Sequence, residues 1–263
     1  KDSIYNFLYG VKRKYIKLYL AYTKLHADIL DFFCRICYTF YRKWISARSD
    51  GAWDKRTKWA VWFLCSFFCP VQDGGDMDQR LYEALQRNPI IAAVRDDGGL
   101  EACLQEDVQV VFVLYGDLCS ISGIIGRIKT AGKLAIVHAD LISGLSVKEI
   151  SVDFLHRNTQ ADGIISTRAN LIQRAKELQM MTILRVFLID SMAYETALGA
   201  KNLRAGAIDI LPGLMPGMIR KLHQATGLPV LTGGLITQKQ EVLQALDAGA
   251  LAISSTAPAV WQM

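Results

Sequence analysis

Apolar and polar positions alternate most regularly between residues 77 and 263, where short apolar runs are separated by amphipathic stretches. The runs are rich in Val, Ile and Leu, which is typical of strands covered on both faces. There are eight of them, at residues 90–94, 108–116, 133–140, 161–167, 181–190, 207–213, 228–234 and 250–256. Apolar residues recur at helical spacing in four of the intervening stretches, at residues 120–132, 168–179, 216–227 and 237–249.

Three of these four helical stretches end in glycine, a residue that favours the end of a helix. Strand-like runs that alternate with helices predict βα units around a parallel sheet. Eight such units predict an α/β fold, a TIM-like (β/α)8 barrel, in which function lies at the C-terminal ends of the strands. Because the eight units share 187 residues, we expect some helices to be short.

Composition separates residues 1–76 from this pattern. They contain 13 Lys and Arg against 7 Asp and no Glu, a net charge of +6, whereas residues 77–263 contain 17 basic and 18 acidic residues, a net charge of −1. They also hold 18 of the 25 aromatic residues and four of the six cysteines. The net charge of +5 for the whole chain therefore belongs to the first 76 residues and gives no reason to expect a basic barrel.

Two structural interpretations of residues 1–76 are open. The basic, aromatic stretch from Val11 to Leu30 is compatible with a helix on a membrane surface, whereas the apolar stretch from Trp59 to Val71 is shorter than the ~20 residues that span a bilayer. The pairs Cys34/Cys37 and Cys65/Cys69 resemble halves of a zinc site. Their spacings differ and bulky aromatic residues surround both pairs, which favours incidental cysteines.

A third interpretation is that residues 1–76 are translated upstream sequence. A 76-residue stretch without Glu is unusual, since Glu is among the commonest residues. The bacterial ribosome-binding sequence GGAGGUGAU followed by AUG is translated in frame as Gly74-Gly75-Asp76-Met77, which is the sequence found here. We therefore expect the N-terminal extension to be non-native or poorly ordered, and the native protein to start at Met77 as a single domain of residues 77–263.

The last two strand ends have residues suited to binding phosphate. The seventh run ends in Gly233-Gly234, where the backbone can approach a ligand closely, and the eighth in Ser254-Ser255, which adds hydroxyl donors. In a TIM barrel the loops after strands 7 and 8 commonly form a phosphate site. A tight turn without a ligand is the alternative for each motif.

Other polar residues fall at the predicted strand ends. His138 and Asp140 lie two residues apart, so their side chains share one face of the strand. They are candidates for an acid/base pair or for ligand contacts, and the alternative is that both only form hydrogen bonds within the barrel rim. Arg95, Arg168 and Arg185 are candidates for binding an anion, and Arg185 is the most informative because strand interiors rarely hold arginine.

The sequence lacks the residues that several common kinds of barrel chemistry require. No lysine lies inside a predicted strand or at its C-terminal end, which argues against a Schiff-base aldolase. We find no dinucleotide-binding or Walker motif and no metal-ligand cluster, and we therefore expect no cofactor and no metal. Cys103 and Cys119 are isolated and are expected to be reduced, as in a cytoplasmic protein.

Five stretches identify a family resemblance: "VHADLISGL", "DGIISTRANLI", "RVFLIDS", "ILPGLMP" and "LTGGLIT". In their order and spacing, from about residue 88 to 261, the chain resembles the glycerol-3-phosphate-responsive antiterminators, which regulate bacterial glycerol uptake operons. The resemblance implies a TIM-barrel sensor of glycerol 3-phosphate that acts on the leader mRNA of the operon and is not an enzyme. The ligand-binding residues that it implies are Arg95, His138, Asp140, Ser166, Thr167, Arg168, Arg185 and Asp190. Those implied to hold the phosphate are Gly233, Gly234, Ser254 and Ser255.

The chain departs from the family at Thr237, where a basic residue is frequent, and at Asp209, where Glu is commoner. The barrel's net charge of −1 also argues against RNA binding, unless basic residues of separate helices converge. The candidates for such a patch are Arg127, Lys129, Arg174, Lys176, Arg220 and Lys221. An enzyme acting on a phosphorylated polyol or sugar, with His138 or Asp140 as acid or base, is the alternative function. A membrane-tethered protein anchored by residues 1–76 is a third hypothesis, but we expect no stable membrane association. The sequence leaves open whether the protein forms a homo-oligomer.

Overall fold

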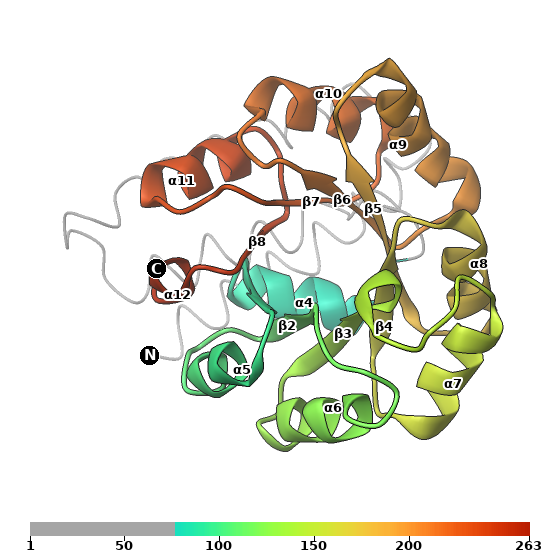
Figure 1. Cartoon of the computed structure of the whole chain (residues 1–263). Helices are drawn as coiled ribbons and strands as arrows, with labels where there is room; N and C mark the ends of the chain where they lie inside the picture. The colour runs from blue at the N-terminus through green and yellow to red at the C-terminus, as the bar shows by residue number, and fades with distance from the viewer. Residues whose placement is uncertain (1–76) are drawn as a thin grey trace, which may run out of the picture. The chain divides into compact units, whose positions relative to one another are not determined.

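The computed structural model describes residues 77–263, which form a closed barrel of eight parallel strands surrounded by helices (Figure 1). The strands follow one another around the barrel in sequence order, and β8 pairs with β1 to close it. Their bounds are β1 Ile90–Val94, β2 Val110–Val113, β3 Leu134–His138, β4 Gly163–Ser166, β5 Met181–Phe187, β6 Ala207–Leu211, β7 Val230–Gly233 and β8 Ala252–Ser255. All eight strands lie within the predicted apolar runs, so the predicted TIM-like barrel is confirmed.

The helices lie around the strands, with α4 across the N-terminal end of the barrel (Figure 1). Several connecting helices have nine residues or fewer, as eight units in a short chain require. The helices are α4 Gln79–Arg87, α5 Asp97–Leu104, α6 Ile121–Thr130, α7 Ile150–Asn158, α8 Ala169–Glu177, α9 Ser191–Leu203, α10 Pro216–Thr226, α11 Lys239–Asp247 and α12 Pro258–Trp261, with a 3-10 turn η2 at Ala139–Leu141.

Two apolar cores result from the alternation of side chains along each strand. The larger core lies between the strands and the outer helices. The smaller core fills the barrel with residues such as Ile136, Ile183 and Ala207, and includes Leu81 and Leu85 from α4. Among the described residues, helix α4 therefore covers the N-terminal end of the barrel and leaves the C-terminal end of the strands as the open end.

Ion pairs hold the closed end. The carboxylate of Asp162, just before β4, accepts hydrogen bonds from the Lys129 ammonium at 2.6 Å and from the backbone N–H of Ala135 at 2.9 Å. Arg80 of α4 lies 3.5 Å from its other oxygen. These contacts connect α4, α6 and two strands, so this end of the barrel serves stability.

The expectations for residues 1–76 lie outside the described residues. This applies to the surface helix, the two cysteine pairs, the apolar stretch from Trp59 to Val71 and the proposed translation of upstream sequence. Within residues 77–263, none of the helices combines the length and apolarity that a transmembrane span needs.

Candidate functional site

Three buried ionisable side chains, those of Arg185, Asp209 and His138, lie at the open end of the barrel. Arg185 and Asp209 occupy neighbouring positions on β5 and β6, two residues beyond Ile183 and Ala207 of the inner core. His138 stands two residues beyond Ile136 on β3. Because side chains alternate along a strand, all three lie on the inner face of the barrel, above its apolar filling.

Arg185 and Asp209 form a buried ion pair. Two guanidinium nitrogens of Arg185, Nε and a terminal nitrogen, each lie 2.7 Å from the same oxygen, Oδ2 of Asp209. Arg185 is 6% exposed and Asp209 is not exposed at all, so each charge needs the other to offset the loss of water. The second carboxylate oxygen of Asp209, Oδ1, has no hydrogen-bond partner.

His138 is a neutral residue at neutral pH. Burial lowers the pKa of its imidazole to about 4, with a further contribution from the positive charge of Arg185, and the nearby Asp140 opposes the shift only in part. The His138 Nδ1 atom is 3.9 Å from Asp140 Oδ2, which is too far for a hydrogen bond, and it has no other partner.

Asp140 connects the end of β3 to the end of β4. Its oxygens accept hydrogen bonds from the Ser166 hydroxyl at 2.8 Å, the Thr167 backbone N–H at 2.7 Å and the Thr167 hydroxyl at 2.9 Å. Three donors occupy this carboxylate, so Asp140 is better placed to fix the two loops than to act as a general base.

The turn after β7 offers backbone donors at the rim. A side chain at Gly233 would collide with Ser254 on β8, so glycine lets the two strand ends approach closely. Gly234 has a φ of 73° and Leu235 a φ of 64°, a strained conformation for leucine that is typical of ligand-binding turns. The backbone N–H groups of Leu235 and Ile236 donate to no acceptor within residues 77–263, whereas the Gly234 N–H points toward β8 at the last pair of the β7–β8 ladder.

Ser254 and Ser255 face opposite sides of β8. The Ser254 hydroxyl lies against Gly233 and makes no hydrogen bond within the described part of the chain. The Ser255 hydroxyl donates to the Ile236 carbonyl at 3.0 Å and accepts from the Ala257 N–H. Ser254 is therefore available to a ligand, whereas Ser255 holds the loop after β7 against β8.

The remaining predicted site residues differ in whether their side chains are free to bind a ligand. Arg95 follows β1, next to β8, and is exposed without a hydrogen bond or ion pair to residues 77–263. Arg168 is exposed at the start of α8, and Asp190 caps α9 by accepting from the Ala193 N–H at 2.8 Å. Arg95 is thus a free cation beside the β8 end, and Asp190 has a structural role.

His138, Arg185, Gly234 and Ser254 all lie at the C-terminal rim of the barrel. Asp209 lies there as well, although the sequence did not predict it as a site residue. The signal for Asp209 was its charge within an apolar strand, the same signal that singled out Arg185. Arg185 itself is neutralised by Asp209, so Arg95 is better suited to bind an anion.

The basic residues considered for RNA do not converge. They lie on α6, α8 and α10, and Figure 1 shows α6 and α10 on opposite sides of the barrel. Arg174 pairs with Asp153 and Glu177, and Lys129 with Asp162. Arg174 and Lys129 are therefore already neutralised by neighbouring carboxylates.

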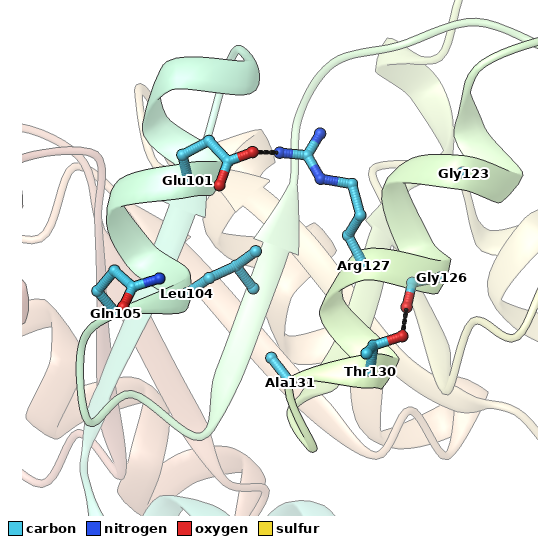
Figure 2. A pocket seen from close by; sticks show the side chains of 8 residues that line it. All are labelled: Glu101, Leu104, Gln105, Gly123, Gly126, Arg127, Thr130 and Ala131. Atoms are coloured by element: carbon cyan, nitrogen blue, oxygen red, sulfur yellow. Dashed lines mark hydrogen bonds and ion pairs between the residues drawn. The ribbon is translucent and has the colours of Figure 1, made fainter.

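Arg127 is also held by acidic residues, at an open groove on the outside of the barrel (Figure 2). It reaches across from α6 to pair with Glu101 and, at 2.7 Å, with Asp97. The groove runs between α5 and α6 and is lined by Glu101, Leu104, Gln105, Gly123, Gly126, Arg127, Thr130 and Ala131. It lies in the helix layer, so it is separate from the site at the strand ends.

The described lysine, cysteine and acidic residues form no further reactive centre at the strand ends. Lys133 lies just before β3, at the closed end, and its ammonium donates to the Glu106 and Val108 carbonyls at 2.6 and 2.7 Å. Cys103 and Cys119 are free thiols, and burial raises the pKa of Cys103 to about 11. Within residues 77–263 there is no group of three His, Cys, Asp or Glu residues placed to hold a metal ion.

Comparison with known proteins gives consistent matches. Residues 90–261 match the family model described as glycerol-3-phosphate responsive antiterminator. The uncharacterized protein YgcP of Escherichia coli is 37% identical over 186 residues, which cover 70% of this chain and 96% of YgcP.

Two crystal structures share the fold and part of the sequence. A glycerol uptake operon antiterminator regulatory protein from Listeria monocytogenes is 33% identical, with a TM-score of 0.62 over 64% of this chain and 92% of that one. A glycerol uptake operon antiterminator-related protein from Thermotoga maritima is 29% identical, with a TM-score of 0.60 over 66% and 98%.

Proposed function

Because this chain belongs to the glycerol-3-phosphate responsive antiterminator family, we propose that it is a sensor of glycerol 3-phosphate. Its liganded form would act on the leader mRNA of a glycerol uptake operon so that transcription continues. The observation that supports the sensor most directly is the turn after β7, where the backbone N–H groups of Leu235 and Ile236 are unpaired within residues 77–263.

The phosphate of the ligand would bind at the turn after β7. Backbone N–H groups of a turn form anion-binding sites because they present several partial positive charges to one point. The Ser254 hydroxyl adjoins this turn, and the unpaired Arg95 follows the neighbouring strand. Together they supply neutral donors and one positive charge for a doubly charged phosphate, without a metal ion.

The glycerol part would extend from this turn toward His138 on the inner face of the barrel. Asp140, Ser166 and Thr167 would fix the loops on that side through their mutual hydrogen bonds. Arg168, at the exposed start of α8, would lie at the edge of the site.

A retention experiment tests the action on RNA. The immobilised leader RNA is incubated with the protein, with and without glycerol 3-phosphate, over a series of salt concentrations. We expect ligand to increase retention and salt to decrease it, because phosphate contacts release counterions. A leader of scrambled sequence serves as the control. Equal retention with and without ligand would contradict the proposal.

A phosphorylated-polyol enzyme is the second candidate, and one observation favours it. His138 is neutral, buried at the barrel mouth and unpartnered at Nδ1, as a general base would be. Proton and phosphorus NMR of glycerol 3-phosphate incubated with the protein separates the two functions. The sensor leaves the ligand spectrum unchanged, whereas an enzyme converts the ligand.

A further inference from the structure

Two buried side-chain atoms at the barrel mouth have no hydrogen-bond partner, and they are the only ones within the described residues. They are His138 Nδ1 and Asp209 Oδ1. His138 is 3% exposed and Asp209 is fully buried, so solvent contributes little to either atom. A buried polar atom without a partner costs about 1–3 kcal/mol, and a bound ligand can supply the missing hydrogen bond.

Arg185 interacts with both residues, with Asp209 by direct contact and with His138 through its charge. It donates to Asp209 through Oδ2 alone, and its charge contributes to the lowered pKa of His138. The charges of Arg185 and Asp209 offset each other and His138 is neutral, so the three side chains carry no net charge. A second anionic group gains nothing here, and the Asp209 Oδ1 atom can only accept a hydrogen bond.

We propose that His138 and Asp209 bind the hydroxyl end of the ligand and select a phosphorylated polyol over a ketone or carboxylic acid with the same carbon chain. The proposal rests on the phosphate site at the turn after β7. In this proposal Asp209 Oδ1 accepts a hydrogen bond from the ligand, while Arg185 holds the carboxylate in place through Oδ2.

The selectivity follows from hydrogen-bond polarity. A hydroxyl group donates to the Asp209 carboxylate, and it suits His138 in either tautomer because it can donate or accept. A carbonyl or carboxylate oxygen has only lone pairs to offer, so it would face Asp209 Oδ1 acceptor to acceptor. Sites built to bind a hydroxyl reject analogues that lack it, because the buried group of the protein then stays unpaired.

Calorimetry with the whole chain tests this selectivity. The probes are glycerol 3-phosphate, dihydroxyacetone phosphate, 3-phosphoglycerate and inorganic phosphate. We expect glycerol 3-phosphate to bind about tenfold or more tightly than the ketone and the acid. Equal affinity for the three organic phosphates would overturn the proposal and leave the phosphate site standing. Failure of all four probes to bind would instead contradict the proposed sensor function.

Asp209→Asn reverses the polarity at the key position without changing its shape. The amide oxygen takes the hydrogen bonds from Arg185, and the amide N–H then faces the site as a donor. We expect the preference for glycerol 3-phosphate over dihydroxyacetone phosphate to fall by about tenfold or more, while inorganic phosphate binds as before. An unchanged preference in the folded variant would contradict the assignment of Asp209.

His138→Leu is the second variant, because Asp209→Asn leaves the Arg185 charge without its ionic partner and can fail to fold. Leucine removes the Nδ1 atom and leaves the ion pair intact. We expect glycerol 3-phosphate to bind about tenfold more weakly and inorganic phosphate to bind as before. Equal weakening of both probes would place the defect at the phosphate end and overturn the role of His138.

Discussion

The charges at the barrel mouth are arranged so that a buried histidine stays neutral beside a buried ion pair. Arg185 and Asp209 satisfy each other, and the positive charge of Arg185 disfavours a second proton on His138. Asp140, whose carboxylate lies 3.9 Å from His138, is occupied by Ser166 and Thr167. The mouth can therefore accept a polar ligand without a large change in its own protonation.

Acid should destabilise the barrel through His138. Its folded pKa of about 4 lies below the ordinary value of 6.5, so between these values the unfolded chain binds a proton that the folded chain does not. The stabilising contribution is present above pH 6.5 and is lost as pH falls toward 4. Urea unfolding should show wild type losing roughly 1–2 kcal/mol more than His138→Gln between pH 6.5 and 5. Parallel losses in the two proteins would contradict the lowered pKa.

Asp140 should contribute to stability through its three hydrogen bonds. Asp140→Ala leaves the buried Ser166 hydroxyl and the Thr167 donors without their acceptor, and we expect a loss of about 1–3 kcal/mol. Asp140→Asn keeps one acceptor oxygen and should lose less. Denaturant unfolding measures both. If the alanine variant were as stable as wild type, Asp140 would not hold the β3 and β4 ends together.

The helix ends show how far local sequence rules extend. Gly132, Gly227 and Gly249 follow α6, α10 and α11 with positive φ, as the glycines at these positions predicted. Helix α8 has the same type of ending but uses Gln179, with a φ of 57°. A non-glycine residue pays a conformational cost in this region, which the rest of the structure must offset.

Replacing Gln179 by glycine should therefore stabilise the protein. We expect a gain of up to about 1 kcal/mol, because glycine adopts the left-handed conformation without strain. Gly227→Ala at the end of α10, where φ is 66° and nothing crowds an added Cβ, is the matched control and should lose a similar amount. Thermal unfolding of both variants measures the effect. Two changes of the same sign would contradict it.

The strands were predictable because short, continuous apolar runs that alternate with helices indicate buried strands. Part of the site was not predictable, because it depends on how the closed barrel pairs its strands. The partnership of Arg185 with Asp209 requires the register between β5 and β6, which the sequence does not reveal. Strand alternation alone could have separated Ser254 from Ser255, because adjacent residues cannot both face the ligand. The helices α5, α7 and α9 were not singled out, and the distribution of basic residues around the barrel needed the fold.

At the scale of the whole molecule, the two ends of the barrel differ in character. The closed end is covered by α4 and held by the ion pairs of Asp162. Of the eleven large apolar side chains that are exposed within residues 77–263, nine lie at the open end. They are Leu118, Leu141, Val147, Ile150, Phe187, Ile189, Met192, Leu214 and Leu235. Exposed apolar surface of this kind is typical of binding regions, which supports our proposal that the open end is the functional end.

The central claim, that this end binds glycerol 3-phosphate through the turn after β7, is tested most directly with Gly234→Asp in calorimetry. The control is Gly132→Asp, because Gly132 has nearly the same φ, 74° against 73°, and lies at the closed end with nothing near an added Cβ. We predict that Gly234→Asp weakens binding by about 100-fold or more, since like charges in contact cost several kcal/mol, and that Gly132→Asp binds like wild type. Equal affinity of the two folded variants would contradict the account.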